Sequence, residues 1–344
     1  MPTSTARPLI SVVMPVRNGE SWLPECMESL IRQTVRDFEV IVVDDGSTDR
    51  TIEVLNVWAR QFDRFRVIQQ KPVGVAVALN CGIEASSGQY IARMDADDIA
   101  LPERFAKQVE FLNVRPHVGV VGSWFETFGV GRSGLVKTPI GDDAIRARLL
   151  FGSPFAHPSV MLRRSALDGV SGPYSLKRGV EDFDLWTRLS RSTKLDNIPK
   201  VLLRYRLHSM QVSQAELSHS EEGALGIRRD LLRSFGISLV GNERSLLIAT
   251  SLSPRIGYEA DAGAVEQLLK LIVSKVGSSG WCSRRVVLKE CRDAWWRSCK
   301  NRGPGRESDR IFARSSLAGR GVLSLVRRTR LRWGIKVQST RKQS

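Results

Sequence analysis

Three aspartates, Asp95, Asp97 and Asp98, stand within four residues in the first third of the chain. Carboxylates this close repel one another unless a cation neutralises them. Hard oxygen ligands suit Mn²⁺ or Mg²⁺, with water and phosphate oxygens completing the coordination shell. The spacing therefore predicts a divalent-cation site, and a solvated acidic loop that caps the next helix is the alternative.

A second acidic cluster, Asp44 and Asp45, precedes the residues Gly46-Ser47-Thr48-Asp49. Asp, Gly, Ser and Thr are the residues that a tight turn and a helix N-cap require, so a purely local role is one interpretation. The functional interpretation is that one carboxylate accepts a hydrogen bond from a nucleotide base or a ribose hydroxyl. The cluster alone leaves both interpretations open.

A third acidic pair, Glu181 and Asp182, lies next to the aromatic residues Phe183 and Trp186. A general base needs a carboxylate in a partly desolvated pocket within reach of a substrate hydroxyl, and aromatic neighbours favour such a pocket. Acidic residues are also favoured in the first turn of a helix, which is the structural alternative.

Two of the four histidines, His157 and His208, are candidates for binding. His208 follows a strand pattern in which Arg204 and Arg206 alternate with apolar residues, and such a set suits a diphosphate or a metal ion. A lone histidine more often has a structural role, and that interpretation stays open for both.

Strands and helices must position these groups, and the first half of the chain alternates between the two patterns. Alternation at this spacing implies βαβ units and a mostly parallel sheet, in which ligands bind beyond the carboxyl ends of the strands. The two aspartate clusters follow the second and the fourth strand, so we expect them at one crevice. The predicted strands cover 9–14, 38–43, 66–68 and 90–94, and the predicted helices 21–33, 47–62 and 75–85.

Beyond residue 115 the pattern is mixed, and from about residue 213 it is helical. The fold class predicted is therefore α/β with a C-terminal helical extension. We expect strands over 118–121 and 201–208, helices over 142–150, 181–190, 222–235, 243–252, 262–276 and 283–299, and a linker over 301–305.

The net charge of +16 is concentrated at the C-terminus, where residues 281–344 hold 18 Lys and Arg against 4 Asp and Glu. A tail of this composition favours binding to a polyanion. Residues 322–333 interleave apolar residues with four arginines, which predicts a basic amphipathic helix on an anionic membrane or a terminal helix packed on the protein. No run of 18 apolar residues and no secretory signal are present, and the cysteines are odd in number, so we expect a cytoplasmic protein, peripheral on the inner face of the membrane if the tail binds lipid.

Taken in order, the motifs resemble the inverting family 2 glycosyltransferases of the GT-A fold, of the bacterial cell-surface polysaccharide type. The resemblance implies a catalytic domain over 1–212, with a nucleotide-sugar half over about 1–100 and an acceptor half over about 101–212. Residues 213–300 would be a helical accessory region and 301–344 a basic tail. The segments that carry the resemblance are 10–18, 29–34, 43–49, 74–82, 92–98, 157–159, 181–182 and 205–208.

The resemblance also implies how the nucleotide-sugar donor is bound. Pro15 and Asp45 would line the pocket for the base, uracil being favoured, and Asp44 and Asn80 would belong to the same donor site. His157 would lie beside the sugar or the acceptor.

The remaining roles concern the metal and the chemistry. Asp97 would be the direct ligand of Mn²⁺ or Mg²⁺, with Asp95 nearer the ribose and His208 at the metal or the diphosphate. Asp182 would be the catalytic base and Glu181 its supporting neighbour. The acceptor would be a carbohydrate or a lipid-linked hydroxyl compound, and configuration at the anomeric carbon would invert.

The chain departs from the family pattern around the third helix. Pro72 stands where the family often has Asn, and Leu79 where it often has Arg, whereas Gly74 and Asn80 fit. The departure concerns the base and the diphosphate contacts rather than the class of enzyme.

Two other classes of function predict different sequence features. A nucleotidyltransferase would carry a glycine-rich, basic loop after the first strand, but Val16-Arg17-Asn18-Gly19-Glu20 holds a single Arg and a single Gly. A non-enzymatic polyanion-binding protein would use the basic tail, yet the sequence shows no nucleic-acid-binding module, so a nucleic-acid partner is not expected.

Overall fold

The computed structural model describes residues 7–131, 133–170, 172–177, 179–209, 217–239, 241–252, 260–302 and 306–318. Two compact units divide the chain between Ser234 and Phe235. The first unit contains the sheet and all the residues singled out above except those of the tail. Its boundary lies beyond the 212 expected for a catalytic domain, because the helix α8 (Leu217–Ser234) belongs to it.

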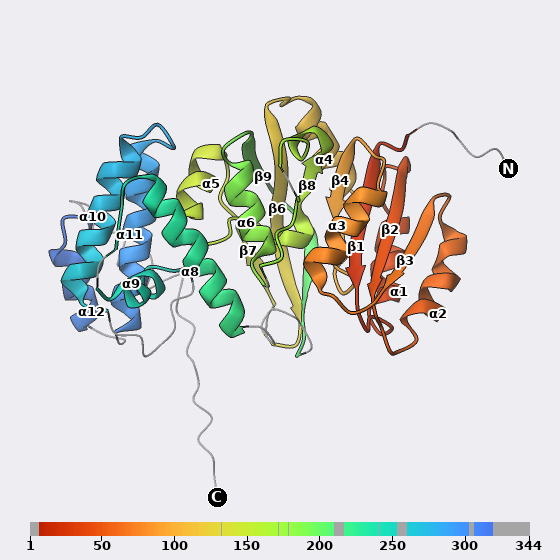
Figure 1. Ribbon diagram of the computed structural model, residues 1–344, viewed down its shortest axis with the longest axis horizontal. Coiled ribbons are helices and arrows are strands. Elements are labelled where there is room, and N and C mark those ends of the chain that lie inside the picture. The colour runs from red at the N-terminus through yellow and green to blue at the C-terminus, as the bar shows by residue number, and fades with distance from the viewer. Residues whose placement is uncertain are drawn as a thin grey trace, which may run out of the picture. The chain divides into compact units, whose positions relative to one another are not determined.

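The first half of the sheet is parallel, in the order β3-β2-β1-β4 (Figure 1). The register places Val16 of β1 opposite Asp44 of β2, so the loops that follow these strands leave the sheet at one edge. The strands are β1 (Ile10–Val16), β2 (Phe38–Asp45), β3 (Phe65–Gln70) and β4 (Tyr90–Arg93).

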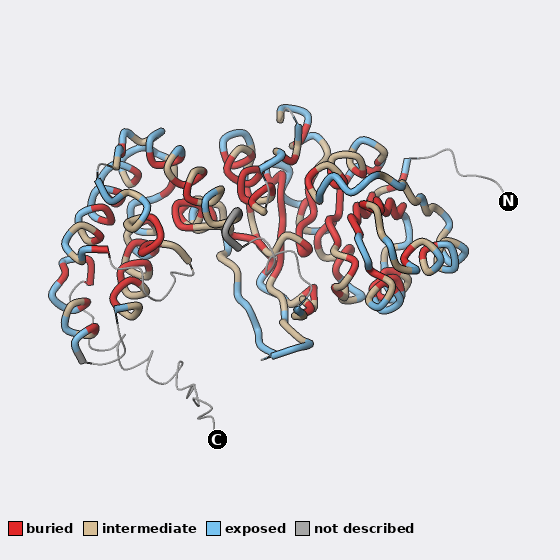
Figure 2. The backbone as a smooth tube through the Cα atoms, turned by 60° about the horizontal axis from the view of Figure 1, so that its bottom comes forward, coloured by how far each residue is buried: buried red, intermediate tan, exposed pale blue. Residues whose placement is uncertain are grey.

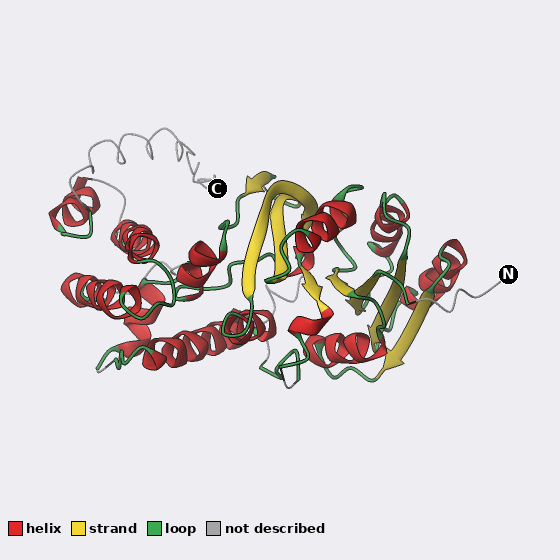
Figure 3. Ribbon diagram, turned by 90° about the horizontal axis from the view of Figure 1, so that it is seen from above, coloured by secondary structure: helices red, strands yellow, loops and turns green. Residues whose placement is uncertain are grey.

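Side chains alternate between the two faces of these strands, as the strand period of two requires. Val40 and Val42 of β2 join the apolar core beneath α1, α2 and α4, whereas Ile41 and Val43 pack on the other face with Ala78 of α3. Helices consequently lie on both sides of the strands (Figure 3). They are α1 (Leu23–Ile31), α2 (Thr51–Trp58), which continues into the 3-10 turn η1 (Ala59–Gln61), α3 (Val75–Ala85) and α4 (Arg104–Asn113).

The second half of the sheet is mixed rather than parallel. β8 joins it antiparallel to β4, β6 is antiparallel to β8, and β9 runs parallel to β6 along most of its length. The short β5 and β7 pair antiparallel with β9 and β6. These strands are β5 (Ile99–Ala100), β6 (Val118–Gly129), β7 (Gly134–Val136), β8 (Met161–Arg163) and β9 (Lys194–Leu207).

Short helices accompany this half. They are α5 (Asp142–Leu149), α6 (Glu181–Leu189) and two 3-10 turns, η2 (His157–Ser159) and η3 (Arg164–Ala166). Two of them, α6 and η2, begin at predicted site residues. Figure 2 shows that the buried part of the tube follows the strands and the inner sides of these helices.

The second unit is helical, with α10 packed along α11 and α11 against α12. No helix of the described residues is apolar over a length that would cross a bilayer. The predicted amphipathic segment 322–333 lies outside the described residues. The helices are α9 (Glu243–Ala249), α10 (Ala262–Gly277), α11 (Arg284–Asn301) and α12 (Arg306–Arg314).

Pro15 lies within β1, although the sequence predicted that it would end this strand. A proline in a central strand removes a ladder hydrogen bond. The Met94 amide bonds the Val13 carbonyl, and β4 ends at Arg93, so Pro15, which faces the same side two residues later, meets no strand there. The missing N–H is therefore not needed at this point.

Candidate active site

A cavity of about 740 Å³ opens at the carboxyl edge of the parallel strands. Six of the residues predicted for the site line it, and they come from β1, β2, the loop after β4, the start of α6 and the end of β9. These six are Pro15, Asp45, Asp95, Asp97, Glu181 and His208.

Asp95, Asp97 and Asp98 offer oxygen atoms that all lie within 4.8 Å of one another. Asp98 is only 1% exposed, and its Oδ2 has no hydrogen-bond partner in the described part of the chain. Burial, together with the charges of the two neighbouring aspartates, raises the pKa of Asp98 well above its usual value. A crowded set of oxygen ligands, two of them partly exposed and one buried with an unpaired atom, fits a hard divalent cation.

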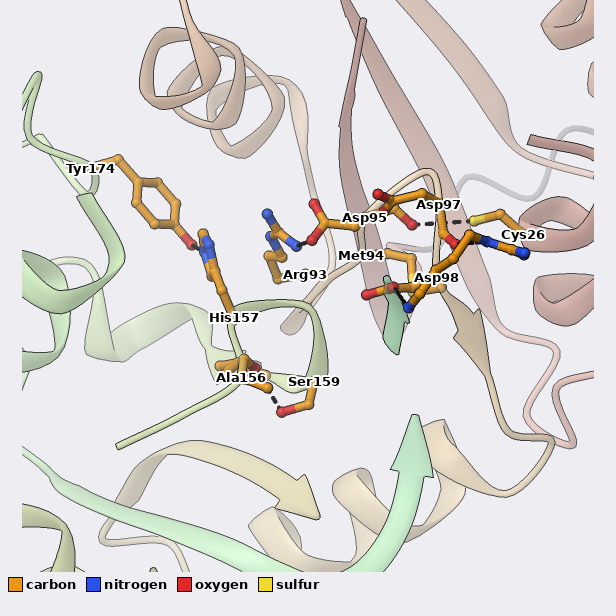
Figure 4. A network of polar contacts seen from close by, with 12 residues as sticks. Cys26, Arg93, Met94, Asp95, Asp97, Asp98, Ala156, His157, Ser159 and Tyr174 are labelled. Carbon is orange, nitrogen blue, oxygen red and sulfur yellow. Dashed lines mark hydrogen bonds and ion pairs between the residues drawn. The ribbon is translucent and has the colours of Figure 1, made fainter. Parts of the chain in front are cut away.

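A buried arginine partly balances these charges. Arg93, the last residue of β4, forms an ion pair with Asp95 at the near end of the cluster (Figure 4). Burial by itself would lower the pKa of this guanidinium, but the charge of Asp95 outweighs it and raises the pKa. Arg93 therefore remains a fixed cation beside the acidic loop.

The other end of the cluster is held by β9. His208 Nε2 lies 2.8 Å from Asp97 Oδ2, and the Arg206 amide donates to Asp98 Oδ1 over 2.8 Å. Trp22, which also lines the cavity, stacks on the His208 ring at 4.9 Å and accepts the Arg206 guanidinium over its own ring at 4.8 Å. These contacts fix the imidazole against Asp97.

Asp45 lines the cavity and also holds other residues of the cavity wall in place by hydrogen bonds. Its carboxylate accepts hydrogen bonds from the Gln70 side chain at 2.8 Å and from the amides of Val73 and Gly74 at 2.9 Å each. The loop is close to Gly46, whose φ of 73° a side chain would strain and where an added Cβ would meet Pro72 at 2.7 Å. Pro72, the departure from the family pattern, is thus packed against Gly46, the residue that follows Asp44 and Asp45.

Asp44 is not among the residues that line the cavity. It is buried and accepts hydrogen bonds from the hydroxyl and the amide of Ser47. This is the turn-capping geometry that the sequence offered as an alternative for the cluster. Any contribution of Asp44 to donor binding would act through the turn.

Asn80 is engaged with the protein backbone rather than with the cavity. Its amide donates to the Tyr174 carbonyl at 2.7 Å and accepts from the Tyr174 amide at 2.9 Å. The Tyr174 hydroxyl lies 2.8 Å from His157 Nε2, and Figure 4 shows this pair facing Arg93 and Asp95. Burial, followed by the charge of Arg93, lowers the pKa of His157 well below its usual value. His157 is therefore a neutral ring that contacts Tyr174 and does not line the cavity.

Glu181 and Asp182 form the first turn of α6. Glu181 faces the cavity, and its Oε2 is buried without a hydrogen-bond partner among the described residues. Asp182 accepts from the Ser153 hydroxyl at 3.2 Å and does not line the cavity. Burial and the charge of Asp182 raise the pKa of Glu181 to about 7, and burial also raises the pKa of Asp182.

The sequence did not assign a role to Trp22, Arg93 or Tyr174. A charged residue at the end of the buried pattern Tyr90-Ile91-Ala92-Arg93 was a usable signal, because a buried charge needs a partner. Trp22 fits the apolar spacing of the helix predicted over 21–33, and no pattern in the sequence around Tyr174 marks it as a site residue.

Comparison with known proteins defines the class of this chain. Residues 11–170 match the model of the family described as Glycosyl transferase family 2. An uncharacterized glycosyltransferase of Haemophilus influenzae is 30% identical over 262 residues, which are 71% of this chain and 79% of that protein. The putative glycosyltransferase EpsE of Bacillus subtilis is 34% identical over 226 residues, 63% of this chain and 80% of EpsE. The chain belongs to glycosyl transferase family 2 and is a transferase.

A third relative has a named reaction. It is the UDP-Gal:alpha-D-GlcNAc-diphosphoundecaprenol beta-1,3-galactosyltransferase of Escherichia coli, 30% identical over 205 residues, 58% of this chain and 74% of that enzyme.

Solved structures confirm the predicted GT-A fold with its C-terminal helices. Residues 1–349 of S. aureus TarS in complex with UDP-GlcNAc superpose with a TM-score of 0.58 at 17% identity, covering 85% of this chain and 91% of that one. The mannosyltransferase PcManGT of Pyrobaculum calidifontis, in complex with GDP-Man and Mn²⁺, gives 0.53 at 18% identity, covering 88% and 89%.

Proposed function

We propose that this glycosyltransferase moves a sugar from a nucleoside-diphosphate sugar, a UDP-sugar being favoured, to an acceptor hydroxyl with inversion at the anomeric carbon. The observation that carries the proposal is the single cavity in which Asp45, Asp95, Asp97, Glu181 and His208 meet. The TarS complex with UDP-GlcNAc and the UDP-Gal-dependent relative support a UDP-sugar donor. That relative's diphosphoundecaprenol acceptor supports a lipid-linked or carbohydrate acceptor in the synthesis of a surface polysaccharide or glycolipid.

A divalent cation, Mn²⁺ or Mg²⁺, fits the acidic cluster. Asp97 would be its direct ligand, with Asp95 and His208 beside it, and the Mn²⁺ in the PcManGT complex supports this choice. When bound, such a cation stabilises negative charge on a departing diphosphate. The chain itself holds Asp97 in place through His208, and His208 through the ring of Trp22.

We assign the nucleoside to the part of the cavity that Asp45 lines. Pro15 and the loop 72–74 line the cavity together with Asp45. Because the Asp45 carboxylate fixes the amides of Val73 and Gly74, we expect it to shape the base pocket. Its Oδ2 accepts from Gly74, and a carboxylate oxygen has a second lone pair that a base could use.

Asp182 is proposed as the general base. It removes the proton from the acceptor hydroxyl while that oxygen attacks the anomeric carbon from the face opposite the diphosphate, so the bond to the diphosphate breaks as the new glycosidic bond forms. The raised pKa of Asp182, caused by burial, makes its carboxylate a stronger base than a solvated aspartate. Glu181 adds negative charge next to it and faces the donor in the cavity.

The experiment that tests the proposal measures donor hydrolysis and transfer on a panel of UDP-, GDP- and dTDP-sugars, with Mn²⁺, with Mg²⁺ and with EDTA. We expect UDP-sugars to be the best donors and EDTA to stop turnover. A chain that turns over none of these sugars would refute the donor class, and turnover unaffected by EDTA would refute the metal role of Asp97.

Asp182→Asn provides the test of the base. Loss of the general base should lower kcat by roughly 10² to 10⁴-fold, while the dissociation constant for UDP, measured by calorimetry, stays close to that of the wild type. Asp184→Asn is the matched control, since Asp184 lies on the same helix and pairs with Lys177 and Arg188 outside the cavity. An Asp182→Asn enzyme with full activity would remove Asp182 from the mechanism.

A further inference from the structure

Four carboxylates line the cavity, but only two of its described lining residues can carry a positive charge. One is His208, which is already held against Asp97 at 2.8 Å. The other is Arg17, whose guanidinium is not deprotonated in proteins. A diphosphate brings negative charge into a cavity whose charged residues are mostly acidic, so a permanent cation in its lining has a clear use.

The side chain of Arg17 is available to a ligand. It is exposed, and no hydrogen bond or ion pair engages it in the described part of the chain. The other arginines close to the acidic groups are engaged: Arg93 is paired with Asp95. Arg206 is likewise paired with Glu25. Because neither of these two lines the cavity, Arg17 is the arginine that can meet an anion there without breaking a contact.

The backbone of the loop after β1 is held in place by the turn after β2, the neighbouring strand. Asn18 has a φ of 53°, a left-handed conformation that Asn adopts more readily than most residues. Its amide donates to Ser47 Oγ over 2.8 Å, and its Oδ1 accepts from the Thr48 amide over 2.8 Å. The Gly19 amide donates to Thr51 Oγ1 over 2.8 Å. A loop bound at these points loses little freedom when a ligand binds to it.

These contacts give Asp44 a place in the same assembly. Its carboxylate accepts hydrogen bonds from the hydroxyl and the amide of Ser47, whose oxygen in turn accepts from the backbone of the loop after β1. The acidic pair after β2 therefore has two structural tasks. Asp45 fixes the loop 72–74. Asp44, which does not line the cavity, supports the loop that carries Arg17.

The loop after β1 also lies where a donor diphosphate must pass. It begins beside Pro15, in the part of the cavity assigned to the nucleoside, and ends at Trp22. Trp22 stacks on His208 at 4.9 Å, and His208 contacts Asp97, the proposed ligand of the cation. In a nucleoside-diphosphate sugar the diphosphate is attached to the nucleoside and is the part that the cation binds. It must therefore run from the first of these places toward the second, along this loop.

We propose that Arg17 binds the diphosphate of the donor and is the fixed positive charge that the chain itself supplies to it. The inference rests on the proposed function, since a donor of another class would present no diphosphate here. A guanidinium suits this role because its planar set of N–H donors can bind two phosphate oxygens at once. The same contact can form with the donor and with the departing nucleoside diphosphate, so Arg17 should affect donor binding more than the chemical step.

The test compares the affinities of the full-length chain for UDP and for uridine with Mn²⁺ present. Calorimetry measures UDP directly and uridine by displacement of UDP. Arg17→Gln should lower the affinity for UDP about tenfold and leave that for uridine within about twofold, because uridine carries no phosphate. Arg17→Lys should recover part of the loss, since it keeps the charge and lacks the planar fork. In donor hydrolysis, Arg17→Gln should raise KM more than it lowers kcat.

Arg60→Gln and Lys71→Gln are the matched controls. Each removes one exposed positive charge from the first unit, and neither residue lines the cavity. Both variants should bind UDP like the wild type. The circular dichroism spectrum of the wild type should be kept by every variant, because all three substituted side chains are exposed.

Three results would overturn the inference. An unchanged UDP affinity of Arg17→Gln would show that Arg17 does not reach the diphosphate. Equal losses for UDP and uridine would place Arg17 at the nucleoside instead. A loss of the same size in Lys71→Gln would assign the effect to long-range charge rather than to a contact. Failure of the proposed function is read separately: a wild type that binds neither UDP nor GDP with Mn²⁺ refutes the donor class, and this inference with it.

Discussion

At the start of α6, two adjacent carboxylates combine a proposed catalytic role with a cost to the stability of the fold. Glu181 is 8% exposed and faces Asp182, so its ionised form is disfavoured by burial first and by like charge second. This neighbour of the proposed general base therefore destabilises the fold when it carries its charge. Such a conflict is typical of active sites, where perturbed pKa values concentrate.

Glu181→Gln should accordingly stabilise the folded protein at alkaline pH. The folded-state pKa of Glu181, about 7, lies above the ordinary 4.5, so the wild type loses stability as pH rises from 4.5 to 7 and does not regain it above 7. The Gln variant lacks this loss, and we expect it to be more stable than the wild type by about 1–3 kcal/mol near pH 8, with little difference near pH 4.5.

Thermal unfolding at these two pH values checks this prediction, with Glu53→Gln on the exposed side of α2 as control. Equal stability of the Glu181→Gln variant and the wild type at alkaline pH would show that Glu181 is not desolvated in solution. The same variant should lose transfer activity, and the acid side of the wild-type activity profile should fall as pH drops through the raised pKa values of this pair.

Among the elements, the tie between α3 and the segment 172–177 has the clearest structural consequence. Asn80 makes two hydrogen bonds to the backbone of Tyr174, and Tyr174 in turn reaches His157. Leu176 of the same segment lines the cavity. The side chain of Asn80 thus holds the segment 172–177 in place, and this segment forms part of the cavity wall.

Asn80→Ala should release this wall. Hydrogen exchange of the amides in 172–177 should become faster, the stability should fall by about 1–3 kcal/mol, and the KM for the donor should rise more than kcat falls. Asn80→Asp keeps an acceptor for the Tyr174 amide and should show a weaker effect. If Asn80→Ala weakened UDP binding while leaving exchange in 172–177 unchanged, Asn80 would contact the donor directly, as the family resemblance implied.

At the scale of the whole molecule, the cluster of basic residues and the candidate active site lie in different parts of the chain. The cavity lies entirely within the unit that ends at Ser234, whereas the strongly basic residues 281–344 lie in the other unit. The first unit also contains every strand of the sheet and its apolar core. Donor binding should therefore not require the second unit.

The chain ending at Ser234 should fold cooperatively and bind UDP within about threefold of the full-length affinity, because a compact unit with its own core can fold alone. Thermal unfolding followed by circular dichroism and calorimetric titration with UDP check this expectation. Loss of cooperative unfolding would show that the second unit is needed for the stability of the first. Binding to anionic vesicles that is lost on removing 319–344 would assign membrane contact to the tail that the sequence singled out.

The sequence by itself determined the local order of the molecule and the class of the enzyme. The β-branched run of β2 and the helical spacing of α3, predicted over 75–85, are set by side-chain periods that act over a few residues. Asp45, Asp95 and Asp97 could be assigned to one crevice because parallel strands end at one edge. The motifs in their order also indicated family 2, which the comparisons confirm.

Only the tertiary structure decided which residues meet across the chain. His208 and Asp97 are 111 residues apart, and Tyr174 and Asn80 are 94 apart; both contacts depend on how distant segments pack together. The antiparallel entry of β8 beside β4, which makes the second half of the sheet mixed, depends on packing that no local pattern encodes. The same holds for Glu181 and Asp182: their neighbourhood in sequence says that both are at the start of a helix, but the helix orientation points one into the cavity and the other toward Ser153.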